Sequence, residues 1–196
     1  MNFLFTEHCP NFALVIIHAH RQVVLNICGT EIKSIQDIFM DLCSDSCVFL
    51  EGLAHKAMLQ GARNIITMIL DIILKGSLKY NRLCCIPIFI IKIFDSHSGD
   101  LWYLIITALS DHPRYGLLIV GYSLGGAVAS LLAQELLSKQ RNTNCKQRDV
   151  PKDIMIRCIT YGSPPTYSCP NNYTNTHIFS IKNHNDVASK IFMLMN

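Results

Sequence analysis

GLLIVGYSLGGAVASLLAQELL, residues 116–137, is the stretch that decides the fold of this 196-residue chain. It opens with the continuous apolar run Leu117–Val120, which is typical of a strand buried on both faces. It closes with Ala127–Leu137, where apolar residues recur at helical spacing among good helix formers. A strand, a glycine-rich turn and a helix therefore follow one another, which predicts an α/β protein.

The turn reads Gly121-Tyr122-Ser123-Leu124-Gly125, the pattern G-x-S-x-G. A serine that projects from a sharp turn needs small residues two positions to either side, because the strand end and the helix start pass close together there. Gly121 and Gly125 meet that need, so the pattern predicts a nucleophile elbow with Ser123 as the nucleophile. The helix that follows directs free N–H groups at the same point, which makes the Leu124 N–H a predicted oxyanion donor.

The composition favours one apolar domain over residues 1–196. Half of the residues are hydrophobic and 16% are charged, which suits a lipid interface or a fragment that lacks its cover. The net charge of +3 comes from scattered residues without a basic stripe, so nucleic acid is not expected as a partner. The nine cysteines lack paired C-x-x-C spacing, which favours reduced, mostly buried thiols and no metal site.

No segment has the length or composition of a membrane span. The most apolar run, residues 83–94, contains Pro87 and Lys92 and falls short of about 18 residues, and the first residues do not resemble a signal peptide. We therefore expect a cytoplasmic protein or one bound peripherally to the cytoplasmic side of membranes, while a longer isoform could be membrane-anchored.

The N-terminal part predicts a β-hairpin and a second oxyanion donor. The β-rich runs 11–18 and 23–28 are joined by a polar turn, which is typical of antiparallel strands. Gly29-Thr30 ends the second run, ahead of a helical stripe over 32–42. A turn of this kind presents backbone N–H groups to a nearby oxyanion, so the Thr30 N–H is the second predicted donor.

The segment from residue 41 to residue 99 is less regular. We expect residues 41–52 to be irregular and a core helix to run from about residue 54 to residue 74. His55 at the start of that helix could be a ligand or a base, but a local backbone contact is the simpler interpretation. Residues 75–99 are interpreted as an insertion, whose apolar part, 84–94, predicts an extra strand, a lid or a membrane-contacting loop.

Further strands are expected at residues 154–161 and 177–181, which gives a mostly parallel sheet with antiparallel N-terminal strands. Chemistry in such sheets gathers beyond the carboxyl ends of the strands. Asp186 follows the last strand there and is the predicted acid partner of Ser123, with turn capping as the alternative role. His112 precedes the central strand at the opposite end, so we do not expect it to be a base.

These landmarks together resemble the class 3 (fungal-type) lipases, and most closely the sn-1-specific diacylglycerol lipases. The matching pieces are VVLNICGTEIKSIQDIFMDL (23–42), GLAHKAM (52–58), the stretch 115–137, TYGSPP (160–165) and IKNHNDVASKI (181–191).

The resemblance implies an α/β-hydrolase that hydrolyses the sn-1 ester of diacylglycerol at a membrane surface. It implies Ser123 as nucleophile, Asp186 as triad acid, and Thr30 with Leu124 as the oxyanion hole. It also implies calcium, although the residues themselves call for no cofactor.

The chain departs from the family pattern at four places. Tyr122 stands where the family usually has histidine, Ala57 stands where it usually has glycine, and residues 75–99 are extra. No histidine follows Asp186, whereas the family's catalytic histidine does, so we expect a C-terminally truncated lipase. His184 is the only histidine near Asp186 and a weak substitute. The alternative is an inactive lipid-binding or interaction protein that retains the hydrolase fold.

Overall fold

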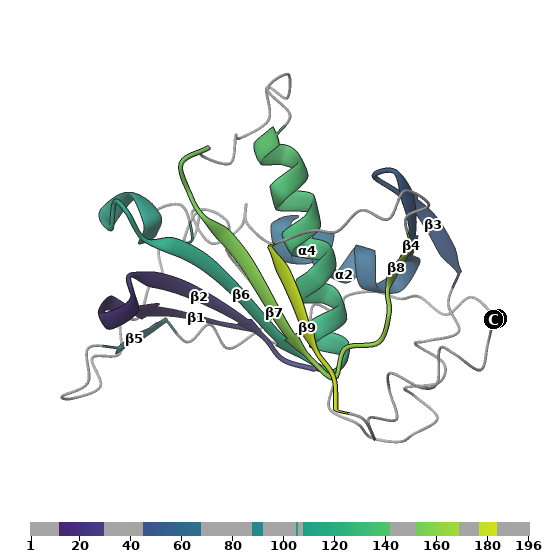
Figure 1. Cartoon of the computed structure of the whole chain (residues 1–196), viewed down its shortest axis with the longest axis horizontal. Coiled ribbons are helices and arrows are strands. Elements are labelled where there is room, and N and C mark those ends of the chain that lie inside the picture. Colours follow the sequence, from purple (N-terminus) through teal and green to yellow (C-terminus); the bar gives the residue numbers. More distant parts are fainter. Residues whose placement is uncertain are drawn as a thin grey trace.

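A six-stranded sheet, two helices and a three-stranded sheet are stacked in three layers (Figure 1). The structure is a computed structural model, and it describes residues 12–29, 45–67, 88–91, 105, 108–141, 152–168 and 177–183. The main sheet contains β1 (Phe12–Ile17), β2 (Gln22–Ile27), β5 (Ile88–Ile91), β6 (Gly116–Tyr122), β7 (Ile156–Tyr161) and β9 (Ile178–Ile181). The other elements are the short η1 (His18–His20), β3 (Ser46–Phe49), β4 (Gly52–His55), α2 (Lys56–Thr67), α4 (Leu124–Arg141) and β8 (Tyr167–Ser168).

The main sheet has the order β5-β1-β2-β6-β7-β9. β2, β6, β7 and β9 are parallel, and β1 pairs antiparallel with both β2 and β5. This confirms the predicted α/β class, the N-terminal hairpin and the mostly parallel sheet. The carboxyl ends of the four parallel strands consequently meet at one edge, which is called the carboxyl edge below.

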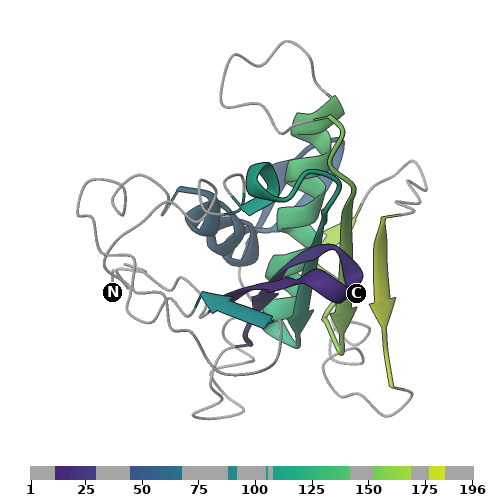
Figure 2. The same cartoon turned by 90° about the vertical axis from the view of Figure 1, so that its left-hand side faces the viewer.

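Strict alternation along the strands creates the core. Leu117 and Ile119 in β6 are buried and turn toward α4. Leu118 and Val120, which alternate with them, are half-buried on the other face. α4 packs on β6 and β7, and α2 packs on α4. Figure 2 shows both helices on the same side of the main sheet.

Glu135 of α4 ties the two helices together. Its carboxylate lies 3.5 Å from the Arg63 Nε of α2 and 3.0 Å from the Lys139 Nζ one turn further along α4. The Arg63 and Lys139 side chains are 50% and 40% exposed, so solvent screens both ion pairs. Only the Arg63 pair joins the two helices, and we expect each pair to contribute little to stability.

The small sheet, with the order β3-β4-β8, corrects the sequence analysis in two places. Residues 46–49 are a strand although they were expected to be irregular, and residues 54 and 55 end β4, so the helix begins at Lys56. β4 is held in extended conformation because all four of its residues pair with β3, and Leu53 and Ala54 pair also with β8, a partner more than a hundred residues away. β8 itself lies between the two strands that the sequence analysis expects at 154–161 and 177–181.

Other predictions fall partly outside the described residues. Residues 88–91, within the predicted insertion, form β5 at the edge of the main sheet. This agrees with the extra strand, one of the three alternatives given for residues 84–94. The rest of 75–99 lies outside the described residues, as do the expected helix over 32–42 and the end of the helix that begins at Lys56.

Cys158, buried at the centre of β7, makes the stability of the fold sensitive to alkaline pH. Burial raises the pKa of its thiol from the ordinary 9.0 to about 12. The unfolded chain loses this proton above about pH 9 while the folded chain keeps it, so we expect the free energy of unfolding to fall by about 1.4 kcal/mol per pH unit in that window.

Denaturant titrations of the wild type and Cys158→Ala at about pH 8 and about pH 10 measure this contribution. The wild type should lose more stability than the variant between the two pH values. Equal losses in the two proteins would mean that Cys158 does not contribute to the alkaline destabilisation.

Candidate active site at the carboxyl edge of the main sheet

Ser123 occupies the turn between β6 and α4, where the backbone is in a left-handed conformation with φ 53°. Its N–H donates a 2.9 Å hydrogen bond to the Tyr161 carbonyl of β7. Its own carbonyl accepts from the N–H groups of Gly126 and Ala127, at 2.9 and 3.2 Å. A non-glycine residue rarely adopts such a φ, so the neighbouring strand and the helix hold Ser123 in a strained turn.

Gly121 and Gly125 are required by close backbone contacts on both sides of Ser123. A Cβ at Gly121 would overlap the Gly125 carbonyl oxygen and lie 2.6 Å from the Gly126 nitrogen. A Cβ at Gly125 would overlap the Ile27 carbonyl oxygen and lie 2.6 Å from the Cys28 carbonyl. The clearance inferred from the G-x-S-x-G spacing is therefore present in the fold.

The N-terminus of α4 is directed at the same point. Leu124 is its first residue, and while the Gly126 and Ala127 N–H groups donate to the Ser123 carbonyl, those of Leu124 and Gly125 come too early in the helix to have an acceptor within it. The dipole of this 18-residue helix adds a partial positive charge there. The Leu124 N–H is therefore in a suitable position for the predicted oxyanion donor.

Gly29, at the end of β2, borders Ser123. A Cβ on Gly29 would lie 2.9 Å from the Tyr122 carbonyl oxygen and 3.6 Å from the Ser123 Cβ. Thr30, the second predicted donor, is the next residue along the chain but lies outside the described residues. Its role remains a prediction, one that the proximity of Gly29 to Ser123 supports.

β9 leads the chain to the same edge. Tyr161 of β7 is in register with Tyr122 on one side and with Ile181 of β9 on the other. The Gly162 N–H donates to the Ile181 carbonyl at 2.9 Å, which fixes the end of β9 two strands away from the turn of Ser123. His184 and Asp186 follow shortly after and lie outside the described residues, so the acid remains a prediction.

None of the described histidines lies at the carboxyl edge. His18 and His112 lie together at the opposite edge, where the His18 Nδ1 is 2.9 Å from the Tyr115 hydroxyl. His177 precedes β9 at that end, and its Nδ1 lies 3.1 Å from the Ile156 carbonyl oxygen. His20 is exposed in η1. The prediction that His112 is remote from the catalytic end is confirmed.

His55 makes the local contact that the sequence analysis favours. Its Nδ1 accepts a 3.4 Å hydrogen bond from the Met58 N–H in the first turn of α2. Its own N–H donates to the Thr166 carbonyl at 3.0 Å, and the residue is buried. His55 thus joins the small sheet to the segment that leaves β7.

Residues 162–166 form a wall of the site that the sequence analysis did not identify. A Cβ at Gly126 would lie 3.0 Å from the Ser163 Cβ, so this segment runs directly against the first turn of α4. Further along, the Thr166 Oγ1 lies 3.4 Å from the Ser130 Oγ. The signal was Gly162-Ser163-Pro164-Pro165 after a strand, which the sequence analysis uses only as part of the family piece TYGSPP.

Within the part of the chain that the structure describes, no three histidine, cysteine or acidic side chains are grouped closely enough to bind a metal ion. Calcium therefore rests on the family resemblance alone. No helix among the described residues combines the length and hydropathy that spanning a bilayer would require.

The sheet order, the strained serine turn and the helix behind it define an α/β-hydrolase. The lipase of Rhizopus microsporus var. chinensis superposes with a TM-score of 0.52 and 17% identity, covering 83% of this chain and 44% of that one. A fungal lipase–inhibitor complex superposes with a TM-score of 0.60 and 16% identity, covering 93% of this chain and 56% of that one. Lipase II of Rhizopus niveus superposes with a TM-score of 0.50 and 18% identity, covering 84% of this chain and 48% of that one. The chain spans about half the length of these solved lipases.

A family model for lipase (class 3) matches residues 29–195. The chain therefore belongs to the class 3 lipase family. The comparison with curated proteins gives no significant match.

Proposed function

We propose that the chain carries the nucleophile of a serine lipase that hydrolyses glycerolipid esters, with the sn-1 ester of diacylglycerol as the substrate. The observation that carries the proposal is Ser123 at φ 53° between β6 and α4, flanked by glycines that tolerate no side chain. Outside catalysis such a turn would only destabilise the fold. The preference for diacylglycerol rests on the family resemblance.

In this mechanism the Ser123 Oγ attacks the ester carbonyl carbon, and a histidine takes the hydroxyl proton. The Leu124 and Thr30 N–H groups stabilise the negative oxygen of the tetrahedral intermediate. The intermediate collapses to an acyl-serine as the histidine returns its proton to the departing glycerol oxygen. Water then releases the fatty acid by the same steps, while Asp186 orients the histidine.

The site of action that we propose is a membrane surface, which the protein reaches from the cytoplasmic side as a peripheral protein. The apolar, charge-poor composition supports this proposal. A role for calcium in this reaction rests on the family resemblance alone.

A second function is an inactive lipid-binding protein that retains the hydrolase fold. The observation that favours it is the lack of a histidine at the carboxyl edge among the described residues. A serine without a base is a poor nucleophile, so this alternative predicts an intact elbow without turnover.

A fluorophosphonate probe distinguishes the two functions. We expect covalent labelling of the full chain at Ser123, complete loss in Ser123→Ala, and no loss in Ser138→Ala, which changes a serine at the far end of α4. Mass spectrometry of the labelled peptide identifies the site. A folded wild-type chain that stays unlabelled would favour the inactive alternative.

A further inference from the structure

The face of the main sheet that turns away from α4 carries exposed apolar side chains beside Ser123. A Cβ at Gly121 would meet the backbone of α4, and the Thr160 Cβ lies close to Gly126, so both positions face α4. Alternation along the strands therefore turns their neighbours Tyr122 and Tyr161 to the other face. Four residues gather there at the carboxyl ends of adjacent strands and are called the edge patch. They are Tyr122, Tyr161, Phe179 and Ile181, with exposed fractions of 68%, 42%, 54% and 50%.

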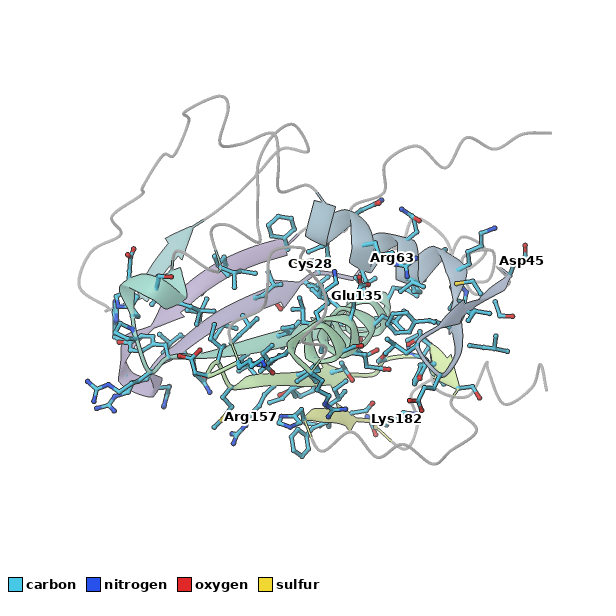
Figure 3. The ribbon with its side chains drawn as sticks, turned by 90° about the horizontal axis from the view of Figure 1, so that it is seen from above. Cys28, Asp45, Arg63, Glu135, Arg157 and Lys182 are labelled. Atoms are coloured by element: carbon cyan, nitrogen blue, oxygen red, sulfur yellow. The ribbon has the colours of Figure 1, made fainter. Side chains whose placement is uncertain are left out.

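Two basic side chains accompany the edge patch. Arg157 lies on the same face of β7 as Tyr161, and Lys182 follows Ile181 directly; both are exposed. Figure 3 shows Arg157 and Lys182 on the β9 side of the molecule. The strands β6, β7 and β9 carry no acidic residue, so along these three strands the exposed apolar groups are accompanied by basic charge.

We propose that the edge patch, with Arg157 and Lys182, binds the surface of an anionic lipid bilayer and so holds Ser123 against it; this rests on the proposed lipase function. Tyrosine side chains suit the boundary between headgroups and acyl chains, and apolar side chains such as Phe179 enter it. The cations are attracted to the headgroups of acidic lipids. Tyr122 precedes Ser123, so docking on this patch brings the reactive turn to the lipid.

The other exposed apolar group offers a contrast. Val48 and Leu53 face each other across β3 and β4 and are 79% and 50% exposed. They lie in the small sheet, which the helices separate from the main sheet (Figure 1). Their exposed neighbours Asp45 and Glu51 are acidic, which an anionic surface would repel. This pair therefore serves as a matched control.

Sedimentation of the full chain with phosphatidylserine-containing and pure phosphatidylcholine vesicles tests the proposal. Phe179→Thr with Ile181→Thr should lower the partition coefficient on anionic vesicles about tenfold. Val48→Thr with Leu53→Thr should leave it unchanged. Arg157→Gln and Lys182→Gln should each lower it about fivefold on anionic vesicles and have little effect on phosphatidylcholine.

The charge variants keep the test decisive if the threonine variants fail to fold, because both side chains are exposed and solvated. Unchanged partition of the charge variants, or equal loss in the control pair, would overturn the proposal. Light scattering that shows a wild-type dimer converted to a monomer by the threonine changes would assign the patch to self-association instead. Fluorophosphonate labelling without vesicles tests the lipase function separately. A chain that binds vesicles but is not labelled would refute the lipase function and leave the proposal for the edge patch standing.

Discussion

Gly125→Ala is expected to lower the free energy of unfolding by about 3 kcal/mol or more and to abolish the reactivity of Ser123. The added methyl group would overlap the Ile27 carbonyl oxygen and lie 2.6 Å from the Cys28 carbonyl. These are backbone atoms of the last residue of β2 and of the residue after it. β2 is held in the sheet by β1 and β6, so these atoms cannot rotate away as a side chain would. The turn must therefore move away from β2, and with it the oxyanion donor of Leu124.

Gly126→Ala is the matched control for that change. Its methyl group would lie 3.0 Å from the Ser163 Cβ, 3.1 Å from the Gly121 carbonyl oxygen and 3.2 Å from the Thr160 Cβ, so each contact is longer than those at residue 125. A small shift relieves this contact, and alanine favours the helix by up to about 1 kcal/mol over glycine. Denaturant unfolding and probe labelling should therefore show a far smaller effect at residue 126. Equal effects at 125 and 126 would contradict the argument from backbone contact.

The sequence predicted the parts of the fold that local pattern determines. Three predicted elements are present: the strand at Leu117–Val120, the helix after it and the N-terminal hairpin. Each buries one face, and the spacing of apolar residues along the chain shows which face that is. The parallel class followed from strands alternating with helices. The elbow followed from five residues, since the close approach of strand and helix requires both glycines.

The small sheet could not be predicted because nothing local marks it. GLAHKAM contains a strand ending and a helix beginning without a break, and its first four residues are extended where they pair with β3 and, at Leu53 and Ala54, with β8. β8 is two residues long, too short to show any alternation. The wall formed by residues 162–166 is a consequence of the same pairing, because it links β7 to β8 along α4.

The site forms where segments from distant parts of the chain come together. The sequence gives the order of these segments along the chain but not their positions in space. Ser123, Gly29 and the end of β9 lie far apart in the chain and meet because four parallel strands end at one edge. The order of the strands, with β9 beyond β7, brings the segment before Asp186 to that edge. The edge patch follows from the register of the last residue pairs, which no sequence pattern encodes.

Ser123→Gly is expected to abolish probe labelling while making the protein more stable than Ser123→Ala by about 1 kcal/mol. Both variants lack the Oγ, so both lose the nucleophile. Alanine keeps a Cβ at φ 53° and with it the left-handed strain, whereas glycine adopts this conformation freely. Comparing the two variants separates the strain of the turn from the loss of the hydroxyl.

Thermal and denaturant unfolding of the two variants measure that difference, and circular dichroism checks that both retain the fold. Equal stability would mean that the turn of Ser123 is relaxed. A more stable glycine variant would mean that the fold holds residue 123 in an unfavourable conformation only because a serine side chain must project there. Strain that a single substitution relieves would lie at the residue whose hydroxyl is proposed to react. Because the inactive alternative keeps the same elbow, probe labelling of the wild type, and not stability, separates the two functions.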